Sequence, residues 1–130
     1  MNKLYEELKV IQAIAPQDIG TADVTGSYLP LADANRVLAV LTTAALTTGK
    51  IATVELLQAT DASGTGSKEL VAPVSGTSVD SGAVTVQVEV CGDDFDTNNG
   101  FAYFAVKATC DETAKVGSAL AIKGDLRYSN

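Results

Sequence analysis

Residues 84–110 have the sequence VTVQVEVCGDDFDTNNGFAYFAVKATC, in which two alternating apolar segments flank a turn rich in Gly, Asp and Asn. Successive side chains of an extended chain point to opposite sides, so one side of the first segment carries four apolar residues, Val84, Val86, Val88 and Val90. The other side carries polar residues and a cysteine. This period of two is typical of a strand with one side in a hydrophobic core, and it predicts a β-sandwich.

The rest of the chain continues this pattern of short apolar segments separated by turns. Gly, Pro, Asp, Ser and Thr cluster in two segments that we expect to be loops, 16–26 and 73–82. Besides the two segments above, strands are expected at 9–15, 27–31, 36–46, 51–62, 68–72 and 118–128. We therefore predict an all-β fold, a single-domain β-sandwich or jelly roll of about seven to eight strands.

The first fifteen residues, MNKLYEELKVIQAIA, allow two interpretations. Leu4, Leu8 and Ile11 lie near helical spacing, whereas residues 9–15 alternate as in a strand. Both patterns are accommodated by a short N-terminal arm or helix, 1–15, that leads into the first strand. The β-sandwich domain is then expected to span 16–130.

The strand expected at 36–46, RVLAVLTTAAL, is apolar on both sides. Such strands are covered on both faces, here by the second sheet and by a neighbouring subunit. Val37, Leu38 and Val40 are therefore candidate residues of a subunit or capsid interface. A buried helix is the alternative, because Ala and Leu favour helices, although the threonines of this region do not.

The two cysteines are expected to remain free thiols. Alternation places Cys91 on the outward side of its strand and Cys110 on the inward side of the later one. If the two strands formed a simple hairpin, these cysteines would also lie on the order of 25 Å apart, far beyond the reach of a disulfide. Free thiols are typical of a reducing compartment.

Charge and composition exclude several classes of function. The net charge of -7 opposes binding to nucleic acid or to anionic membranes, which both need a cationic surface. The chain contains no histidine, so catalytic triads and imidazole acid-base chemistry are excluded. We therefore predict a protein that is not an enzyme and needs no cofactor. The N-terminus has no continuous apolar segment typical of a signal peptide, which predicts synthesis in the cytoplasm.

The acidic turn at 93–100 is a weak candidate for calcium. Asp94, Asp96 and Asn98 alternate oxygen ligands as calcium-binding loops do. The register of an EF-hand is not kept, because Asn99 occupies the place of the required Gly and Ala105 that of the final Glu. The alternative is that Asp and Asn serve here as turn residues.

The order of several segments resembles that of small structural proteins of tailed bacteriophages. These segments are LKVIQAIAPQDI, RVLAVLTTAAL, ATVELLQATDASGTGSKEL and VTVQVEV followed by DDFDTNNGFAYFAVKAT. The chain resembles in particular the capsid decoration, or cement, proteins of these phages. The resemblance spans most of the chain and rests on pattern and composition rather than on a catalytic motif.

The resemblance implies a structural protein of the virion, made in the host cytoplasm, that binds the major capsid protein on the capsid exterior and reinforces the head. It also implies a homotrimer. In this interpretation Leu4, Tyr5 and Leu8 would anchor an N-terminal docking arm, because aliphatic and aromatic side chains dominate interface energy. The loops at 61–68 and 92–100 would form a rim. The alternatives are a carbohydrate-binding or adhesive module and another virion accessory, such as a head fibre or tail component.

Overall fold

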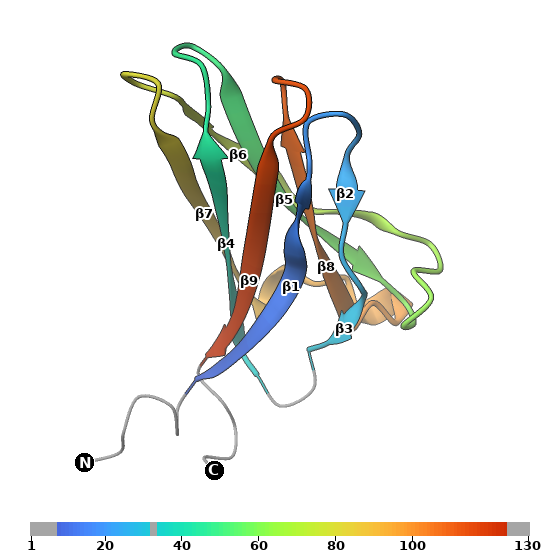
Figure 1. Cartoon of the computed structure of the whole chain (residues 1–130). Helices are drawn as coiled ribbons and strands as arrows, with labels where there is room; N and C mark the ends of the chain where they lie inside the picture. Colours follow the sequence, from blue (N-terminus) through green and yellow to red (C-terminus); the bar gives the residue numbers. More distant parts are fainter. Residues whose placement is uncertain (1–7, 32–33, 125–130) are drawn as a thin grey trace, which may run out of the picture.

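The protein folds as two antiparallel sheets packed face to face, in a computed structural model that describes residues 8–31 and 34–124 (Figure 1). The described residues form nine strands and two short 3-10 helices, Gly92–Asp94 and Thr97–Asn99. The strands are β1 (Lys9–Asp18), β2 (Val24–Thr25), β3 (Leu29–Pro30), β4 (Arg36–Ala45), β5 (Ile51–Ala59), β6 (Lys68–Thr77), β7 (Ala83–Cys91), β8 (Tyr103–Cys110) and β9 (Val116–Gly124). The predicted all-β sandwich is confirmed.

The strand order is that of a jelly roll. One sheet has the order β1-β9-β4-β7, and the other has the order β2-β8-β5-β6 with β3 also paired to β8. If β2 and β3 are taken as one interrupted strand, the first strand pairs with the last, the second with the next to last, and so on inward to β5 and β6. This nested pairing is that of a long hairpin rolled up into two sheets, which is the architecture of a jelly roll.

The core lies between the two sheets and consists mainly of small aliphatic side chains. In β4 the inward residues Val37, Ala39 and Leu41 are completely buried. They pack in the same apolar cluster as Leu56 of β5 and Phe104 of β8. Because successive side chains point to opposite faces, each strand has an inward row that faces the core and an outward row whose composition is independent of the core.

Two expectations about element boundaries are wrong. The segment 16–26 is not wholly a loop, since β1 continues to Asp18 and β2 begins at Val24. The segment 73–82 is not mainly loop either, because β6 continues through Pro73 to Thr77 and Val79 lies in the turn that follows. Edge strands tolerate proline because one side of their backbone needs no partner, and β1 and β6 are both sheet edges.

The two strands of residues 84–110 do not form a hairpin with each other. β7 pairs with β4 in the four-stranded sheet, whereas β8 pairs with β5 in the other sheet. Cys91 is exposed and Cys110 is buried, and both thiols are free, as predicted. The turn between them therefore crosses from one sheet to the other instead of closing a hairpin.

Lys123 is an unexpected inward residue. Only 4% of its surface is exposed, and its Nζ donates a hydrogen bond to the carbonyl oxygen of Pro30 at 3.2 Å. It lies opposite Val37 in the register of β9 with β4, near the end of the sandwich where β1 begins and β9 ends. At this open end a long side chain keeps its stem among apolar atoms and satisfies its charged head at a backbone oxygen.

Gly76 allows the two sheets to approach closely along one margin. A Cβ atom at this position would lie 2.5 Å from Cγ1 of Val86 and 2.9 Å from Cγ1 of Val84. Both valines are inward residues of β7 and have stiff, branched side chains. A side chain at residue 76 would therefore force β6 away from β7.

We expect that Gly76→Val destabilises the fold by about 1–3 kcal/mol, the usual cost of overpacking a core. The measurement is the free energy of unfolding in urea at constant m-value. Ala72→Val, at an exposed position of the same strand, is the control and should change stability by less than about 0.5 kcal/mol. Equal stabilities for the two variants would contradict the inference that the sheets meet at Gly76.

Candidate functional site

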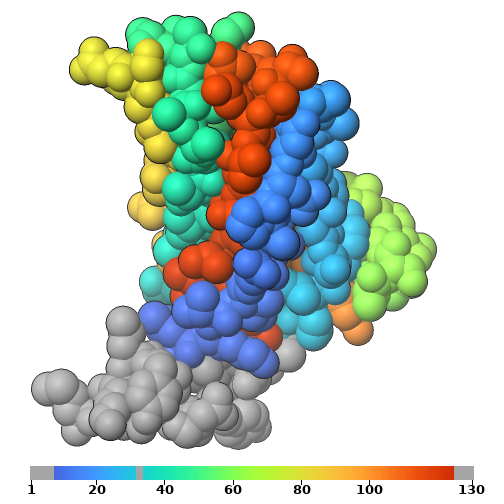
Figure 2. All heavy atoms as spheres, in the orientation of Figure 1, coloured from blue at the N-terminus to red at the C-terminus, as the bar shows by residue number. Residues whose placement is uncertain are grey.

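The outer face of the four-stranded sheet carries an apolar patch. It consists of outward side chains from three neighbouring strands, here called the outer patch: Val10, Leu38, Val40, Leu120 and Ile122. Val10 and Leu120 are 60% and 42% exposed, and the other three are half-buried. This face is turned toward the viewer in Figures 1 and 2, where β7, β4, β9 and β1 lie side by side.

Strand register gathers the outer patch from distant parts of the sequence. Ile122 of β9 lies between its partners Val10 of β1 and Leu38 of β4. Leu120 lies in the same way next to Val40. Because directly opposite side chains in antiparallel strands lie about 4.5–5.5 Å apart, these residues form one continuous surface rather than scattered apolar spots.

The outward positions around the outer patch carry little charge. Most of them are neutral: Gln12, Thr42, Thr85, Gln87 and Ser118. Arg36 and Glu89 are the charged neighbours, toward the end of the sheet where β9 finishes. In a chain of net charge -7, such a face costs little to desolvate when another surface covers it.

The outer face of the opposite sheet has a different character. Lys107 of β8 lies 3.5 Å from the carboxylate of Asp23 and 3.9 Å from that of Glu55 on β5. Exposed ion pairs of this kind contribute little stability, but they are typical of a face that remains in water. The two outer faces therefore differ: the four-stranded sheet groups its apolar side chains in the outer patch, whereas the opposite face carries ion pairs beside isolated apolar residues such as Ile51.

The structure separates the predicted interface residues into three groups. Leu38 and Val40 lie in the outer patch, at the surface. Val37 does not, because it is inward and completely buried, so its prediction as an interface residue is wrong. Leu8 is half-buried near Gly124, while Leu4 and Tyr5 lie outside the described residues.

Three residues of the outer patch were not predicted from the sequence. They are Val10, Leu120 and Ile122. Along their strands both the outward and the inward row contain apolar residues, so the local sequence does not show which row faces outward. The low number of charged residues at outward positions of the neighbouring strands could have identified them. That signal can be read only when the neighbouring strands are known.

The calcium candidate is not assembled as a ligand set. The carboxylate of Asp94 accepts a hydrogen bond from the backbone N–H of Cys91 at 2.9 Å. The carboxylate of Asp96 instead accepts hydrogen bonds from Nζ of Lys68 at 2.6 Å and from the side-chain amide of Asn99. No cluster of acidic and cysteine side chains suited to a metal ion occurs among residues 8–31 and 34–124. The carboxylates of Asp94 and Asp96 are thus both hydrogen-bonded to donors of the protein itself.

Asp96 joins the two loops that were expected to form a rim. Its partner Lys68 follows the turn at 61–67, and the Lys68 ammonium lies 4.3 Å from the centre of the Phe101 ring. The hydrogen bond from Lys68, followed by that from Asn99, holds the pKa of Asp96 below its ordinary value of 3.8. The two loops are thus fastened to each other by a charged contact.

Tyr28 contributes to the same fastening. Its ring lies against Gly64, where a Cβ atom would be 2.7 Å from Cε1, and its hydroxyl group is hydrogen-bonded to the hydroxyl group of Ser67. Sugar-binding proteins use exposed aromatic faces for stacking, and this ring is occupied by the protein's own loop. Tyr103 is half-buried on β8.

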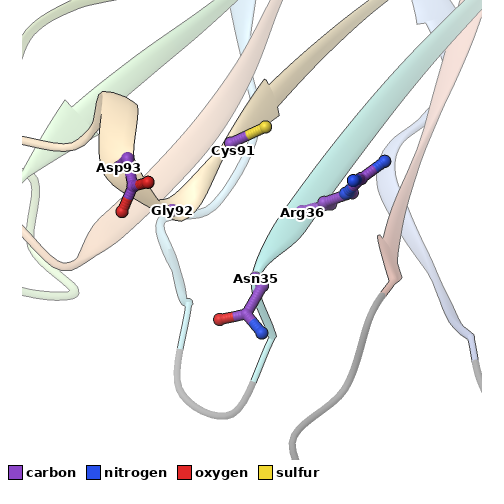
Figure 3. A pocket seen from close by; sticks show the side chains of 5 residues that line it. All are labelled: Asn35, Arg36, Cys91, Gly92 and Asp93. Carbon is purple, nitrogen blue, oxygen red and sulfur yellow. The ribbon is translucent and has the colours of Figure 1, made fainter.

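A shallow pocket of about 250 Å³ lies at one end of β4 and β7 (Figure 3). It is lined by Asn35, Arg36, Cys91, Gly92 and Asp93. In Figure 3 the side chains of Arg36 and Asp93 point in different directions rather than toward a common point. The pocket is smaller than typical ligand sites of about 300–1,000 Å³, and its polar groups do not converge.

Comparisons with protein-family models and with curated protein sequences give no match to this chain. Solved structures do match. A chain of infectious bursal disease virus, Gx strain, is 11% identical over 94% of this chain and 34% of its own length, with a TM-score of 0.55. A chain of the Gt strain is 8% identical over 88% of this chain and 32% of its own length, with a TM-score of 0.51.

A C-terminal carbohydrate-binding module of the laminarinase LamC from Zobellia galactanivorans also matches, at 8% identity over 89% of this chain and 98% of its own length, with a TM-score of 0.47. This chain spans about a third of the length of the two virus chains. At these identities the virus matches establish a shared fold, a β-sandwich of jelly-roll type. None of the described helices is long and apolar enough to cross a membrane.

We expect the contact between Lys68 and Asp96 to make the stability of the fold depend on pH in the acidic range. A carboxyl group whose pKa is lowered by folding contributes stability above its unfolded pKa, and this contribution is lost as the pH falls through the folded pKa. Asp96→Asn should therefore lower Tm at neutral pH, and the difference from the wild type should disappear as the pH falls well below 3.8.

The measurement is thermal unfolding followed by circular dichroism between neutral pH and acid. Asp93→Asn is the control, since this carboxylate lies in the same turn and has no hydrogen bond or ion pair to a described residue. A constant difference in Tm between wild type and Asp96→Asn at every pH would contradict the expected role of the ion pair.

Proposed function

We propose that the protein is a non-enzymatic structural component of a virion that binds the outer surface of a capsid through the outer patch and reinforces the particle. The observation that carries the proposal is the contrast between the two outer faces, one apolar and poor in charge, the other carrying ion pairs. The resemblance to phage decoration proteins and the jelly-roll fold shared with a virus chain support it.

The chemistry of the outer patch suits a protein partner. Fully burying an exposed Val, Leu or Ile side chain contributes about 1.5–3 kcal/mol. Val10 and Leu120 therefore offer most of the gross driving force, and the three half-buried residues of the patch add less. Contiguous apolar patches on soluble proteins often mark interaction sites. The proposed partner is therefore the major capsid protein, and the charge of -7 disfavours nucleic acid as a partner.

We expect Leu120→Glu or Val40→Glu to abolish or strongly weaken attachment, because each change places a carboxylate in the middle of a surface that must be desolvated. Attachment is measured by co-sedimentation with purified heads that lack this protein. A loss of affinity of about tenfold or more is expected, which corresponds to about 1.4 kcal/mol.

Ile51→Glu is the matched control. Ile51 is 39% exposed, close to the 42% of Leu120, but it lies on the outer face of the other sheet. This variant should bind heads like the wild type, and all variants should keep their Tm within a few degrees. Equal binding by Leu120→Glu and Ile51→Glu would refute attachment through the outer patch.

We propose further that the N-terminal arm with Leu4 and Tyr5 adds to attachment. Removal of residues 1–7, which leaves Leu8 in place, should weaken binding to heads while Tm stays unchanged. The measurement is the number of copies retained per particle after washing at increasing salt. Unchanged occupancy would assign docking to the sandwich alone.

A further inference from the structure

β7 is a sheet edge that lacks the features by which edge strands avoid pairing. Among the described strands it pairs with β4 alone, and it forms the free margin of the front sheet in Figure 1. Its register with β4 is unbroken from Cys91 opposite Arg36 to Thr85 opposite Thr42. Unpaired N–H and C=O groups along a long regular edge are a template for another strand.

The other sheet edges are protected. β1 contains Pro16, and its register with β9 is shifted between Gln12 and Ile14 and again before Gln17. β2 and β3 are two residues long each. β6 contains Pro73 and two register shifts. Proline, bulges and short length are the usual means of blocking edge pairing, so β7 is the exception among the edge strands formed by residues 8–31 and 34–124.

We propose that β7 pairs in antiparallel orientation with β7 of a second copy of this chain, so that two four-stranded sheets join into one. A second copy is favoured over an unrelated strand by the self-complementarity of β7. Its inward row consists entirely of valines and its outward row carries a single charge, Glu89. Symmetric dimers require such a surface, which matches itself when rotated by 180°.

The charge pattern of the outward row selects a register. With Gln87 at the two-fold axis, Glu89 of one copy lies opposite Thr85 of the other, and Ala83 lies opposite Cys91. On the inward side valine then faces valine along the whole strand. No like charges meet, whereas a register centred on residue 89 would oppose two carboxylates, which is destabilising.

This pairing also enlarges the proposed attachment surface, a consequence that rests on the proposed function. One four-stranded sheet covers roughly 19 Å by 25 Å, or about 480 Å², at the usual strand spacing and rise per residue. A stable interface buries about 800 Å² on each partner. The two-fold axis of an antiparallel pair is perpendicular to the sheet, so both outer patches face the same way, and the two sheet faces that carry them together cover about 950 Å².

A dimer formed through β7 differs from the trimer that the resemblance to phage decoration proteins implies. When β7 of one copy pairs with β7 of another, neither copy has a free β7 edge left, so the assembly stops at two copies. Light scattering coupled to size-exclusion chromatography should therefore give a mass near twice 13.4 kDa that falls on dilution. A monomer at every concentration, or a trimer, would overturn the proposal.

Charge substitutions test the register in this dimer. Thr85→Glu should raise the dimer dissociation constant about tenfold, because it opposes Glu89 of the second copy twice per dimer, and Thr85→Lys should lower it. Gln12→Glu and Gln12→Lys are controls that change net charge equally on the same outer face, but on β1 at the opposite edge. Equal responses at residues 85 and 12 would overturn pairing through β7.

A cross-link tests the same register without altering charge. Ala83→Cys places a second thiol opposite the exposed native Cys91 of the other copy, and mild oxidation should give a covalent dimer on a non-reducing gel. The two residues of one copy lie roughly 26 Å apart along β7, so they cannot bridge within the chain. The double variant Ala83→Cys, Cys91→Ser should give no such dimer; efficient cross-linking in it, or none in the single variant, would contradict the register.

Discussion

The alternation of side chains along β4 is the constraint on which the rest of the structure depends. β4 is the inner strand that pairs with both β7 and β9. Burial of Val37, Ala39 and Leu41 between the sheets sets its orientation, and a shift of one residue would exchange the two faces. The orientation leaves Leu38 and Val40 outside. The fold therefore cannot bury both apolar rows of this strand within one sandwich, and the second row remains available for a partner.

The close approach of the sheets is a second consequence of the same core. Valine and alanine rows in β4, β7 and β9 keep the layers near each other, and at the margin between β6 and β7 even a Cβ atom at residue 76 would be too large. Outside the core, polar contacts hold the loops together, such as the ion pair between Lys68 and Asp96. A rigid body of this kind presents its outer face with little loss of conformational freedom on binding.

The class of fold could be predicted because apolar and polar residues alternate along most of the strands. The first segment of residues 84–110 predicted the exposed Cys91, and the later one the buried Cys110, as the structure shows. The ends of β1 and β6 were missed, since Pro16 and Pro73 suggest loops and are tolerated only because both strands are edges. Val37 was assigned to an interface because a strand apolar on both sides does not reveal which row faces the core.

The sequence by itself determined which residues share a side of each strand, the absence of histidine chemistry and the acidic surface, because these follow from local order and composition. Only the tertiary structure decided which strands are neighbours. β1 lies beside β9 although most of the chain separates them. This pairing brings Val10 next to Ile122, whose other neighbour is Leu38. The outer patch and the unprotected edge of β7 are both properties of that arrangement. A period of two specifies a face, but it carries no information about the partner across the sheet.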